Sequence, residues 1–205
     1  MLYHIGRWAV RTFFFLFTRF EVRGKENVPR SGGILVSANH LSLADPPVVG
    51  VSLGRATFFM AKEELFHSAF SGYFVSRFGA FPVHRGRLDR EAIRRAERVL
   101  SQGKALVMFP EGARKGKDAH LAEGYLGAAL IAGRSDVPVL PVGITGTESM
   151  VGRSWMLRRP RITVNIGPPF RLPPANGKAR RVELTEQTSL IMASIAALLP
   201  AEYRG

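Results

Sequence analysis

Short runs of β-branched and apolar residues alternate with helix-length segments along most of this chain. The expected strands are residues 20–22, 34–38, 58–61, 79–83, 105–109, 137–144 and 162–166, and the expected helices are 48–53, 72–78, 88–102, 125–132 and 184–199. Neighbouring parallel strands need a crossover, usually a helix, so this alternation is typical of a largely parallel sheet. We therefore expect an α/β fold with a single domain over residues 21–205, in which helices flank a mostly parallel central sheet.

Two of these elements carry signals about their position. Asp89 stands where a capping residue belongs at the start of helix 88–102, and Gly103 stands where that helix would end. Two prolines, Pro138 and Pro141, lie within the run 137–144. Because proline has no backbone N–H to give to a neighbouring strand, we expect this strand at a sheet edge or beside a bulge.

Residues 1–20 form a segment of different character. Arg7 and Arg11 follow helical spacing, and five large apolar residues stand together at 13–17. This combination is typical of a helix lying in a bilayer interface, although a helix packed on the domain's own core also uses such residues. The longest uncharged run, 12–18, is far shorter than the ~20 residues that a spanning helix needs. We expect an amphipathic helix that associates with a membrane surface.

The net charge of +13 favours polyanionic partners, namely nucleic acid, anionic lipid or phosphorylated substrates, and does not choose among them. One stretch, 153–161, mixes Trp155, Met156 and Leu157 with four arginines. It would either insert apolar side chains into a lipid surface or form a solvated basic loop. The absence of cysteine excludes disulfides and thiolate nucleophiles, and the five scattered histidines include no His-Glu-x-x-His motif, so no metal site is expected.

The turn after the second expected strand contains residues 37–45, Ser-Ala-Asn-His-Leu-Ser-Leu-Ala-Asp. A histidine accepts a proton near neutral pH, and a carboxylate fixes its tautomer and stabilises the imidazolium. Residues five apart on a helix lie about 140° apart around the axis, so His40 and Asp45 meet only if the segment bends. Pro46 and Pro47 favour such a bend, but they also fit a simpler interpretation in which Asp45 only caps a helix and His40 is structural.

Three expected strands end in polar turns, which contain Asn39-His40, His84-Arg85 and Glu111-Gly112-Ala113-Arg114. In open α/β sheets, ligands bind beyond the carboxyl ends of the strands. If these strands are neighbours, then His40, Arg85, Glu111 and Arg114 converge on one cleft. The two arginines would then bind a phosphate group, although each arginine alone also fits a solvated surface position.

Two further patterns lack the context that their chemistry needs. Residues 50–54 match the G-x-S-x-G nucleophile elbow of serine hydrolases, but they end an expected helix instead of following a strand. Residues 112–117 resemble a phosphate-binding loop, but only three residues separate their glycines, and Asp118 replaces the Ser or Thr that should follow the lysine. We expect neither pattern to be functional.

Four segments occur together in the order Asn39-His40-x4-Asp45, Gly79-x-Phe81-Pro82-Val83-His84-Arg85, Phe109-Pro110-Glu111-Gly112-Ala113-Arg114 and Val137-Pro138-Val139-Leu140-Pro141-Val142. With these segments and Ala61-Lys62-x-Glu64-Leu65, residues 20–170 resemble the 1-acylglycerol-3-phosphate acyltransferases, a family of glycerolipid acyltransferases. The resemblance implies the fold of that family. It also implies transfer of a fatty acyl group from acyl-CoA or acyl carrier protein to the hydroxyl of lysophosphatidic acid, which gives phosphatidic acid.

The resemblance implies a role for each matching residue. His40 would be the general base on the acceptor hydroxyl, and Asp45 would orient it. The substrate-binding residues would be Asn39, Lys62, Arg85, Glu111, Gly112 and Arg114, with both arginines on the acceptor phosphate. No metal and no cofactor are implied, because the acyl donor is a co-substrate. The implied partners are an anionic membrane surface, a lysophospholipid and the acyl donor, with no specific nucleic acid, and the implied location is the cytoplasmic face of the cell membrane, peripheral or monotopic.

The chain departs from the family pattern in three places. Ala113 stands where threonine is frequent, and His84 replaces an acidic residue. Residues 121–124, Leu-Ala-Glu-Gly, stand where many members have Phe-Lys-x-Gly. The loss of that lysine, with Glu123 in the segment, leaves another lysophospholipid or hydroxyl acceptor as an alternative. A basic protein that binds membrane or nucleic acid without catalysis is an alternative of a different class, and it would not need His40 or Asp45.

Overall fold

The computed structural model describes residues 2–77, 79–84, 89–112, 120–152, 154–174 and 180–204. Its α-helices are α1 (Leu2–Phe17), α2 (Asp45–Ser52), α3 (Ala69–Arg77), α4 (Arg90–Ser101), α5 (Gly127–Ser135), α6 (Trp155–Arg158) and α7 (Arg180–Ala196). Its strands are β1 (Arg19–Arg23), β2 (Ile34–Ala38), β3 (Thr57–Lys62), β4 (Ala80–Val83), β5 (Ala105–Met108), β6 (Val139–Thr145) and β7 (Arg161–Ile166). The short 3-10 helices are η1 (Lys25–Asn27), η2 (Glu63–Phe66), η3 (Thr147–Ser149) and η4 (Ala201–Tyr203). The expected strands and helices are all present, with differences at their ends.

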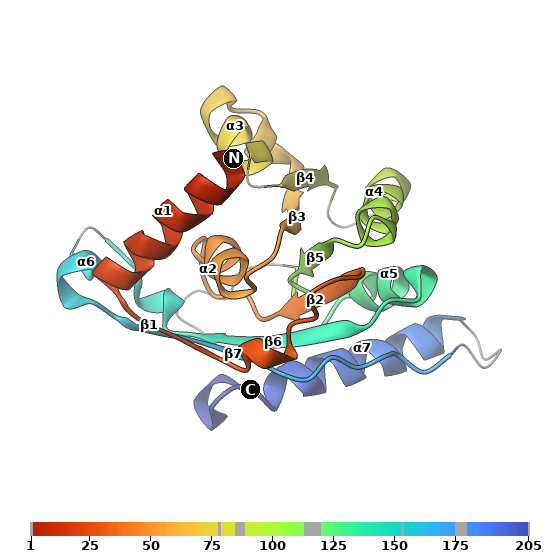
Figure 1. Ribbon diagram of the computed structural model, residues 1–205. Coiled ribbons are helices and arrows are strands. Elements are labelled where there is room, and N and C mark those ends of the chain that lie inside the picture. The colour runs from red at the N-terminus through yellow and green to blue at the C-terminus, as the bar shows by residue number, and fades with distance from the viewer. Residues whose placement is uncertain are drawn as a thin grey trace.

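The strands form one seven-stranded sheet in the order β1-β7-β6-β2-β5-β3-β4 (Figure 1). The five strands from β6 to β4 in that order are parallel. Strand β7 pairs antiparallel with β6, and β1 lies parallel to β7 at the edge. The expected mostly parallel sheet is therefore confirmed. Because the five parallel strands share one direction, the segments that follow them all leave from one edge, which we call the carboxyl edge.

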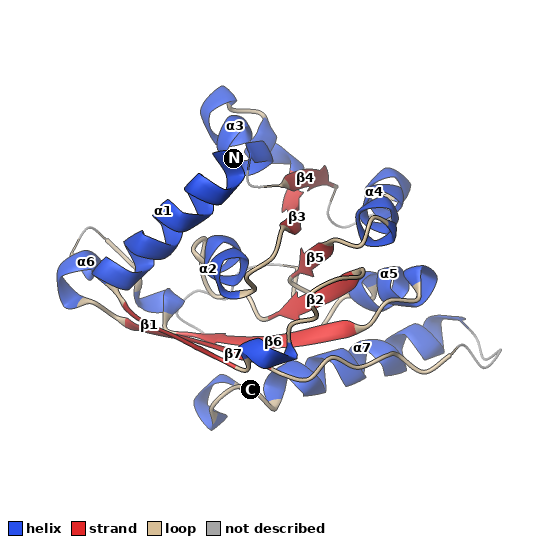
Figure 2. Cartoon of the chain, viewed as in Figure 1, coloured by secondary structure: helices blue, strands red, loops and turns tan. Residues whose placement is uncertain are grey.

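Helices cover both faces of the sheet (Figure 2). Helices α1 and α2 cover one face, where Phe14 and Val48 pack against alternate residues of the central strands. Helices α4, α5 and α7 cover the other face, where Ile131 and Ile191 pack around Leu35 of β2. Strand β2 is thus buried on both faces, as expected for a strand in a parallel sheet that lies between two helical layers.

Strand β6 lies in the interior of the sheet, with a continuous register to β2 on one side and to β7 on the other. The prediction of an edge is therefore wrong, whereas the alternative of a neighbouring bulge fits the pairing: beyond Gly167 the partner segment carries one extra residue before Phe170 bridges Val139. The ladder with β7 ends at the pair Val142 and Ile166, and the carbonyl of Pro141 accepts the N–H of Gly167 just beyond it. The nitrogen of Pro141 points to the same side, past the end of β7. No ladder hydrogen bond is needed there, so an interior strand tolerates the proline.

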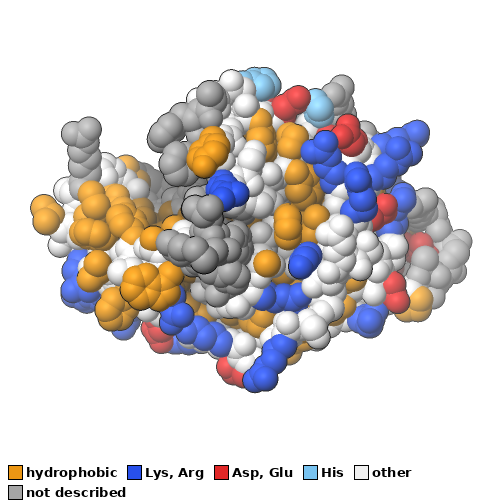
Figure 3. Space-filling view, turned by 45° about the horizontal axis from the view of Figure 1, so that its top comes forward, with side chains coloured by type: hydrophobic (Ala, Val, Ile, Leu, Met, Phe, Trp, Pro, Cys, Tyr) orange, Lys and Arg blue, Asp and Glu red, His pale blue; other side chains and the backbone are white. Residues whose placement is uncertain are grey.

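Helix α1 packs on the domain and also presents apolar side chains at the surface. Phe14 is 3% exposed and belongs to the core shared with α2, and Val10 packs beside it. Trp8, Phe15 and Leu16 are exposed. Figure 3 shows hydrophobic side chains gathered on the left of the view, where α1 and α6 lie in Figure 1. In the described part of the chain, no helix has the length and apolar character required to cross a bilayer.

Candidate active site

The turn between β2 and α2 brings His40 and Asp45 together. His40 Nδ1 lies 2.8 Å from Asp45 Oδ2, and both side chains are buried. Asp45 is the first residue of α2, and the N-cap position belongs to Ala44, which offers no side-chain cap. The interpretation of Asp45 as only a helix cap is therefore wrong, because its carboxylate turns back toward the loop that carries His40.

Asp45 accepts further hydrogen bonds from its own turn and from a distant segment. The backbone N–H groups of Leu41 and Ser42 donate to Oδ2 at 2.6 and 2.7 Å. The hydroxyl of Thr147, in η3 beyond the end of β6, donates to Oδ1 at 2.5 Å. Because an ionised carboxylate only accepts hydrogen bonds, the proton shared with His40 belongs to Nδ1 of the imidazole. In the neutral ring, the lone pair is then on Nε2.

The carboxyl end of β5 supplies two more contacts to His40. Phe109 stacks on the imidazole, with ring centroids 4.2 Å apart and 22° between the planes. The buried carboxylate of Glu111 accepts the backbone N–H of His40 through Oε1 at 2.8 Å. Its second oxygen, Oε2, accepts the backbone N–H of Ala122 at 3.1 Å. Since β5 pairs with β2, the structure brings His40 and Glu111 together at the carboxyl edge.

The arrangement leaves one nitrogen of the imidazole available. Among the described residues, no group forms a hydrogen bond with Nε2 of His40. A neutral imidazole whose Nδ1–H is held by a carboxylate accepts a proton at Nε2. The pair is therefore suited to act as a general base on a hydroxyl, with Asp45 stabilising the imidazolium that forms.

Asn39 connects this turn to the neighbouring strand. Its Nδ2 donates to the carbonyl oxygen of Ile144 at 2.9 Å, and the N–H of Ile144 donates to Asn39 Oδ1 at 2.7 Å. Both ends of the buried amide are thus engaged with the backbone of β6. Asn39 fixes the position where the chain leaves β2, one residue before His40.

Two other expected substrate-binding residues have different surroundings. Lys62, at the end of β3, is exposed and pairs with Glu64 at 2.8 Å. Gly112 has a φ of 68°, a left-handed conformation that favours glycine. A Cβ atom at Gly112 would lie 2.5 Å from the ring of Tyr125, so the lack of a side chain lets that ring pack closely.

A second histidine, His84, follows β4 at the same edge. Its backbone N–H and its Nδ1 both contact Asp89 Oδ2 at 2.9 Å, and its Nε2 contacts the carboxylate of Glu63. His84 thereby links the ends of β3 and β4 to the start of α4. The two expected phosphate-binding residues, Arg85 and Arg114, lie outside the described residues.

Sequence reasoning missed the contribution of Thr147. The contact with Asp45 spans 102 positions in the sequence and exists because β6 lies beside β2. A polar residue soon after the carboxyl end of β6 was the available signal. The wrong placement of β6 at an edge removed the reason to consider it.

Of the two patterns that we expected to be non-functional, the structure describes the first in full and only the first residue of the second. Ser52, the serine of the G-x-S-x-G pattern, lies in α2 and donates to the carbonyl oxygen of Val48 at 2.7 Å. It is therefore a buried helical residue and not a nucleophile on an elbow. Residues 113–117 of the other pattern lie outside the described residues. In the described part of the chain, no group of three or more His, Cys, Asp or Glu side chains could hold a metal ion.

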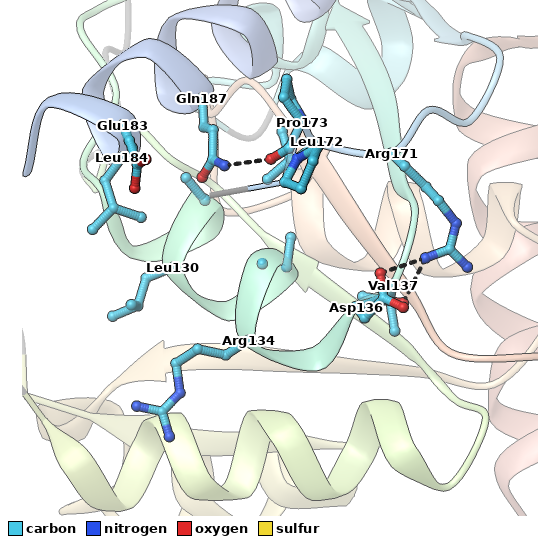
Figure 4. A pocket seen from close by; sticks show the side chains of 14 residues that line it. Leu130, Arg134, Asp136, Val137, Arg171, Leu172, Pro173, Glu183, Leu184 and Gln187 are labelled. Carbon is cyan, nitrogen blue, oxygen red and sulfur yellow. Dashed lines mark hydrogen bonds and ion pairs between the residues drawn. The ribbon is translucent and has the colours of Figure 1, made fainter. Parts of the chain in front are cut away.

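A cavity of about 670 Å³ lies between α5, α7 and the segment after β7 (Figure 4). Leu130, Leu172 and Leu184 are among its lining residues, and Gln187 Nε2 donates to the carbonyl oxygen of Pro173 at 2.9 Å beside it. The end of α5 that lines the cavity leads into the amino end of β6. This cavity therefore lies away from the carboxyl edge and is separate from the site around His40.

A sequence model of the acyltransferase family matches residues 19–145, which include His40, Asp45 and Glu111. The chain belongs to the acyltransferase family. It is therefore an enzyme that transfers acyl groups, and the resemblance drawn from the four sequence segments is confirmed.

Relatives of this acyltransferase from two bacteria share the name 1-acyl-sn-glycerol-3-phosphate acyltransferase. The chain is 30% identical over 151 residues to the 1-acyl-sn-glycerol-3-phosphate acyltransferase of Bacillus subtilis, and the alignment covers 73% of each chain. It is 34% identical over 138 residues to the enzyme of that name from Streptococcus pneumoniae, covering 66% of this chain and 49% of the relative.

A solved structure has the same fold. The crystal structure of PlsC, the 1-acyl-sn-glycerophosphate acyltransferase from Thermotoga maritima, aligns with a TM-score of 0.68 and 26% sequence identity. The alignment covers 92% of this acyltransferase and 75% of the other chain. The expected fold class is therefore confirmed.

Proposed function

We propose that this acyltransferase moves a fatty acyl group from acyl-CoA or acyl carrier protein to the hydroxyl of lysophosphatidic acid, giving phosphatidic acid for phospholipid biosynthesis. The observation that carries the proposal is the buried His40–Asp45 pair at the carboxyl edge of this fold. Relatives from two bacteria and a solved structure, all named for that reaction, support the choice of acceptor.

In this proposal His40 is the general base. Its Nε2 takes the proton of the acceptor hydroxyl while the hydroxyl oxygen attacks the carbonyl carbon of the thioester. The tetrahedral intermediate then collapses and the carbon–sulfur bond breaks. The imidazolium gives the proton to the leaving thiolate, so the products are an ester and a free thiol. The acyl donor is a co-substrate, and the route needs no nucleophile from the enzyme, which agrees with a sequence that has no cysteine.

We propose that the phosphate of the acceptor is bound by Arg85 and Arg114, with Lys62 as a third cation. Arginine matches a phosphate with two parallel hydrogen bonds, whereas lysine acts as a single charge. Lys62 lies at the carboxyl edge, where β3 ends, and its pairing with Glu64 at the surface would have to open for it to meet a phosphate.

The other residues expected to bind substrate take a positioning part in this proposal. Asn39 holds the backbone of Ile144, and Glu111 holds the backbone N–H groups of His40 and Ala122. These groups face the polypeptide and fix the turn that carries the base.

One observation favours a second candidate acceptor. The family pattern has a lysine at the position of Ala122, and the next residue, Glu123, is exposed. A carboxylate near an acceptor phosphate is unfavourable because the two charges have the same sign. Another lysophospholipid or a different hydroxyl acceptor is therefore the alternative substrate.

We further propose that the enzyme binds the cytoplasmic face of the cell membrane as a peripheral or monotopic protein, through its α1–α6 face. We define this face by the exposed side chains of Trp8, Phe15, Leu16, Val151 and Leu157. Phe13 and Trp155 join the two helices with ring centroids 5.9 Å apart. Exposed arginines of the same region are Arg11, Arg158 and Arg159, which suit anionic lipid phosphates.

The topology supports this face as the route of the lipid substrate. Strand β7 is antiparallel to β6, with Thr145 opposite Thr163, so β7 begins at the carboxyl edge. Strand β1 begins opposite the start of β7, at Arg19, directly after α1. The end of α1 and the whole of α6 therefore lie at the edge that carries His40. An acceptor with its acyl chain in the bilayer would then approach the base from the membrane side.

The proposed reaction is tested by mass spectrometry of lipids after the purified enzyme is incubated with a lysolipid and an acyl donor. Lysophosphatidic acid, lysophosphatidylcholine and lysophosphatidylglycerol are offered separately, each with acyl-CoA and with acylated carrier protein. We expect phosphatidic acid from lysophosphatidic acid. A product from another lysolipid alone would replace the acceptor by the alternative, and no product from any acceptor with either donor would contradict the proposal.

A further inference from the structure

The C-terminal 3-10 helix η4 contacts the segment that carries Thr147. The hydroxyl of Tyr203 donates to Glu148 Oε1 at 2.8 Å. Within the described part of the chain, the buried Oε2 of Glu148 has no hydrogen-bond partner, so the Tyr203 hydroxyl is the group that anchors this side chain. Burial raises the pKa of Tyr203 to about 12, and the hydrogen bond with Glu148 adds to the rise.

The Tyr203 hydroxyl therefore holds Glu148, the residue that directly follows Thr147 in η3. Thr147 itself has no exposed surface, and its hydroxyl donates to Asp45 Oδ1 at 2.5 Å. A chain of contacts thus runs from the C-terminal turn through η3 to the carboxylate that holds the imidazole of His40.

A second chain of contacts starts at the same tyrosine. The backbone carbonyl of Tyr203 accepts the N–H of Leu121 at 2.9 Å. The next residue, Ala122, donates its N–H to Glu111, which in turn accepts the backbone N–H of His40. The side chain of Tyr203 reaches the loop that fixes Asp45, and its backbone reaches the loop that fixes Glu111.

We propose that Tyr203 is a positioning residue for acyl transfer, and that its hydroxyl acts by holding Thr147 against Asp45. This inference rests on the proposed function only in taking His40 as the base. The Tyr203 hydroxyl does not contact the substrate. It keeps η3 in place, so that the Asp45 carboxylate keeps its fourth donor and His40 keeps the orientation that directs Nε2 at the hydroxyl.

The kinetic test compares Tyr203→Phe, Thr147→Val and the double variant. Tyr203→Phe removes only the hydroxyl and leaves the backbone contact with Leu121 in place. We expect kcat to fall about tenfold or more in Thr147→Val and several-fold in Tyr203→Phe, with the KM of donor and acceptor unchanged, because misplacing a catalytic group slows the chemical step. The double variant should be no slower than Thr147→Val, since Tyr203 acts through Thr147. Thr147→Ser, which keeps the hydroxyl, should restore most of kcat.

A matched control separates positioning from general stability of the C-terminal segment. Asn165 Nδ2 donates to the carbonyl oxygen of Leu198 at 2.9 Å and so holds the same end of the chain without contacting η3. We expect Asn165→Ala to lower the melting temperature by a similar amount to Tyr203→Phe while kcat stays within about twofold, because a stability loss alone does not misplace the base. The same fall in kcat for Asn165→Ala, or independent effects in the double variant, would overturn the proposal.

A readout that needs no substrate keeps this inference separate from the proposed reaction. Nitrogen chemical shifts of ¹⁵N-labelled histidine report which ring nitrogen carries the proton, and the His40 signals are assigned by their loss in His40→Ala. We expect a fixed Nδ1–H form in the wild type and exchange-broadened or averaged signals in Thr147→Val and Tyr203→Phe. Unchanged His40 signals in both variants would overturn the inference even if phosphatidic acid forms. Altered signals without any phosphatidic acid would support the positioning role and contradict only the proposed reaction.

Discussion

Asp45 is a carboxylate with no exposed surface, and removing such a group from water carries a large cost unless it is paired and hydrogen-bonded. Here four donors offset that cost, of which the two backbone N–H groups come from the turn itself. The fixed carboxylate then holds the imidazole of His40 in one tautomer. The orientation of the base is therefore set by the backbone of residues 41–42 as much as by side chains.

Gly146, the residue before Thr147, allows two segments to approach closely. Its φ is 89°, and a Cβ atom there would lie 1.9 Å from the backbone carbonyl oxygen of Arg161. An alanine in a left-handed conformation costs about 1–2 kcal/mol. We predict that Gly146→Ala lowers the free energy of unfolding by clearly more than this cost, because the start of β7 must also move. Denaturant unfolding measures the change.

Gly54 is the matched control for this prediction. Its φ of 70° is also left-handed, but a Cβ atom there would meet nothing within 4 Å. Gly54→Ala should therefore show the backbone cost alone. Equal losses for the two variants would mean that the close approach at Gly146 has no energetic consequence.

Helix α4 begins at a carboxylate that is sensitive to pH. The backbone N–H groups of Ala92 and His84 hold the pKa of Asp89 well below its usual range. A carboxylate with a lowered pKa in the folded state stabilises the protein above its unfolded pKa of about 3.9, and this contribution is lost as the pH falls further. We predict that the free energy of unfolding falls below about pH 4 with a steeper slope in the wild type than in Asp89→Asn, which caps the helix without a charge.

Asp136→Asn provides the control for that titration. The side chain of Asp136 is 92% exposed, and its ion pair with Arg171 lies at the surface, where such pairs contribute little. Its slope in acid should match the wild type. If the free energy of unfolding of Asp89→Asn falls with acid as steeply as that of the wild type and of Asp136→Asn, other carboxylates govern acid unfolding.

Two adjacent residues of helix α1 have different environments, one in the core and one at the surface. Phe14 is 3% exposed and Phe15 is 68% exposed. We predict that Phe14→Ala lowers the free energy of unfolding by about 3–5 kcal/mol, as for other buried aromatic residues. Phe15→Ala should change it by less than about 0.5 kcal/mol but weaken binding to lipid vesicles. Loss of stability in Phe15→Ala, or unchanged vesicle binding, would contradict the proposed α1–α6 face.

The whole molecule carries a net charge of +13. We predict tighter binding to vesicles that contain phosphatidylglycerol than to neutral phosphatidylcholine vesicles, and weaker binding as salt is raised, because counterions screen exposed charges beyond a Debye length of about 10 Å at 0.1 M. Sedimentation of the protein with vesicles measures both effects. Equal binding to the two vesicle types at every salt concentration would leave only the apolar side chains as the source of affinity.

Local sequence was sufficient for the elements of this fold but not for their order in the sheet. The strands were predictable because their short apolar runs alternate with helix-length segments, and Asp89 was correctly predicted as the cap of α4. The order of strands depends on contacts between distant segments, so the interior position of β6 was missed. The proline signal at Pro141 misled the edge prediction because β7 ends just before the proline nitrogen would need a partner, and the one-residue shift beyond it matches the bulge alternative.

In the candidate site, too, the features set by local sequence were predictable and those set by strand order were not. His40 and Asp45 were predictable because they belong to one short turn, and Glu111 was predictable as the residue that follows a neighbouring strand. Thr147 was not predictable, because nothing local distinguishes it from other threonines until β6 is placed beside β2. Asn39 was expected to meet substrate, yet its amide is engaged with Ile144, a contact that also depends on strand order.

The central claim is that His40 is the base, and it is tested most directly by the kcat of His40→Ala in the lipid mass spectrometry assay. His67→Ala, at an exposed histidine, is the control, and thermal unfolding verifies that both variants fold. We predict that His40→Ala loses about 10²–10⁴-fold or more in kcat, the range for removal of a general base, while His67→Ala keeps wild-type turnover. Wild-type turnover by a folded His40→Ala variant would contradict the account.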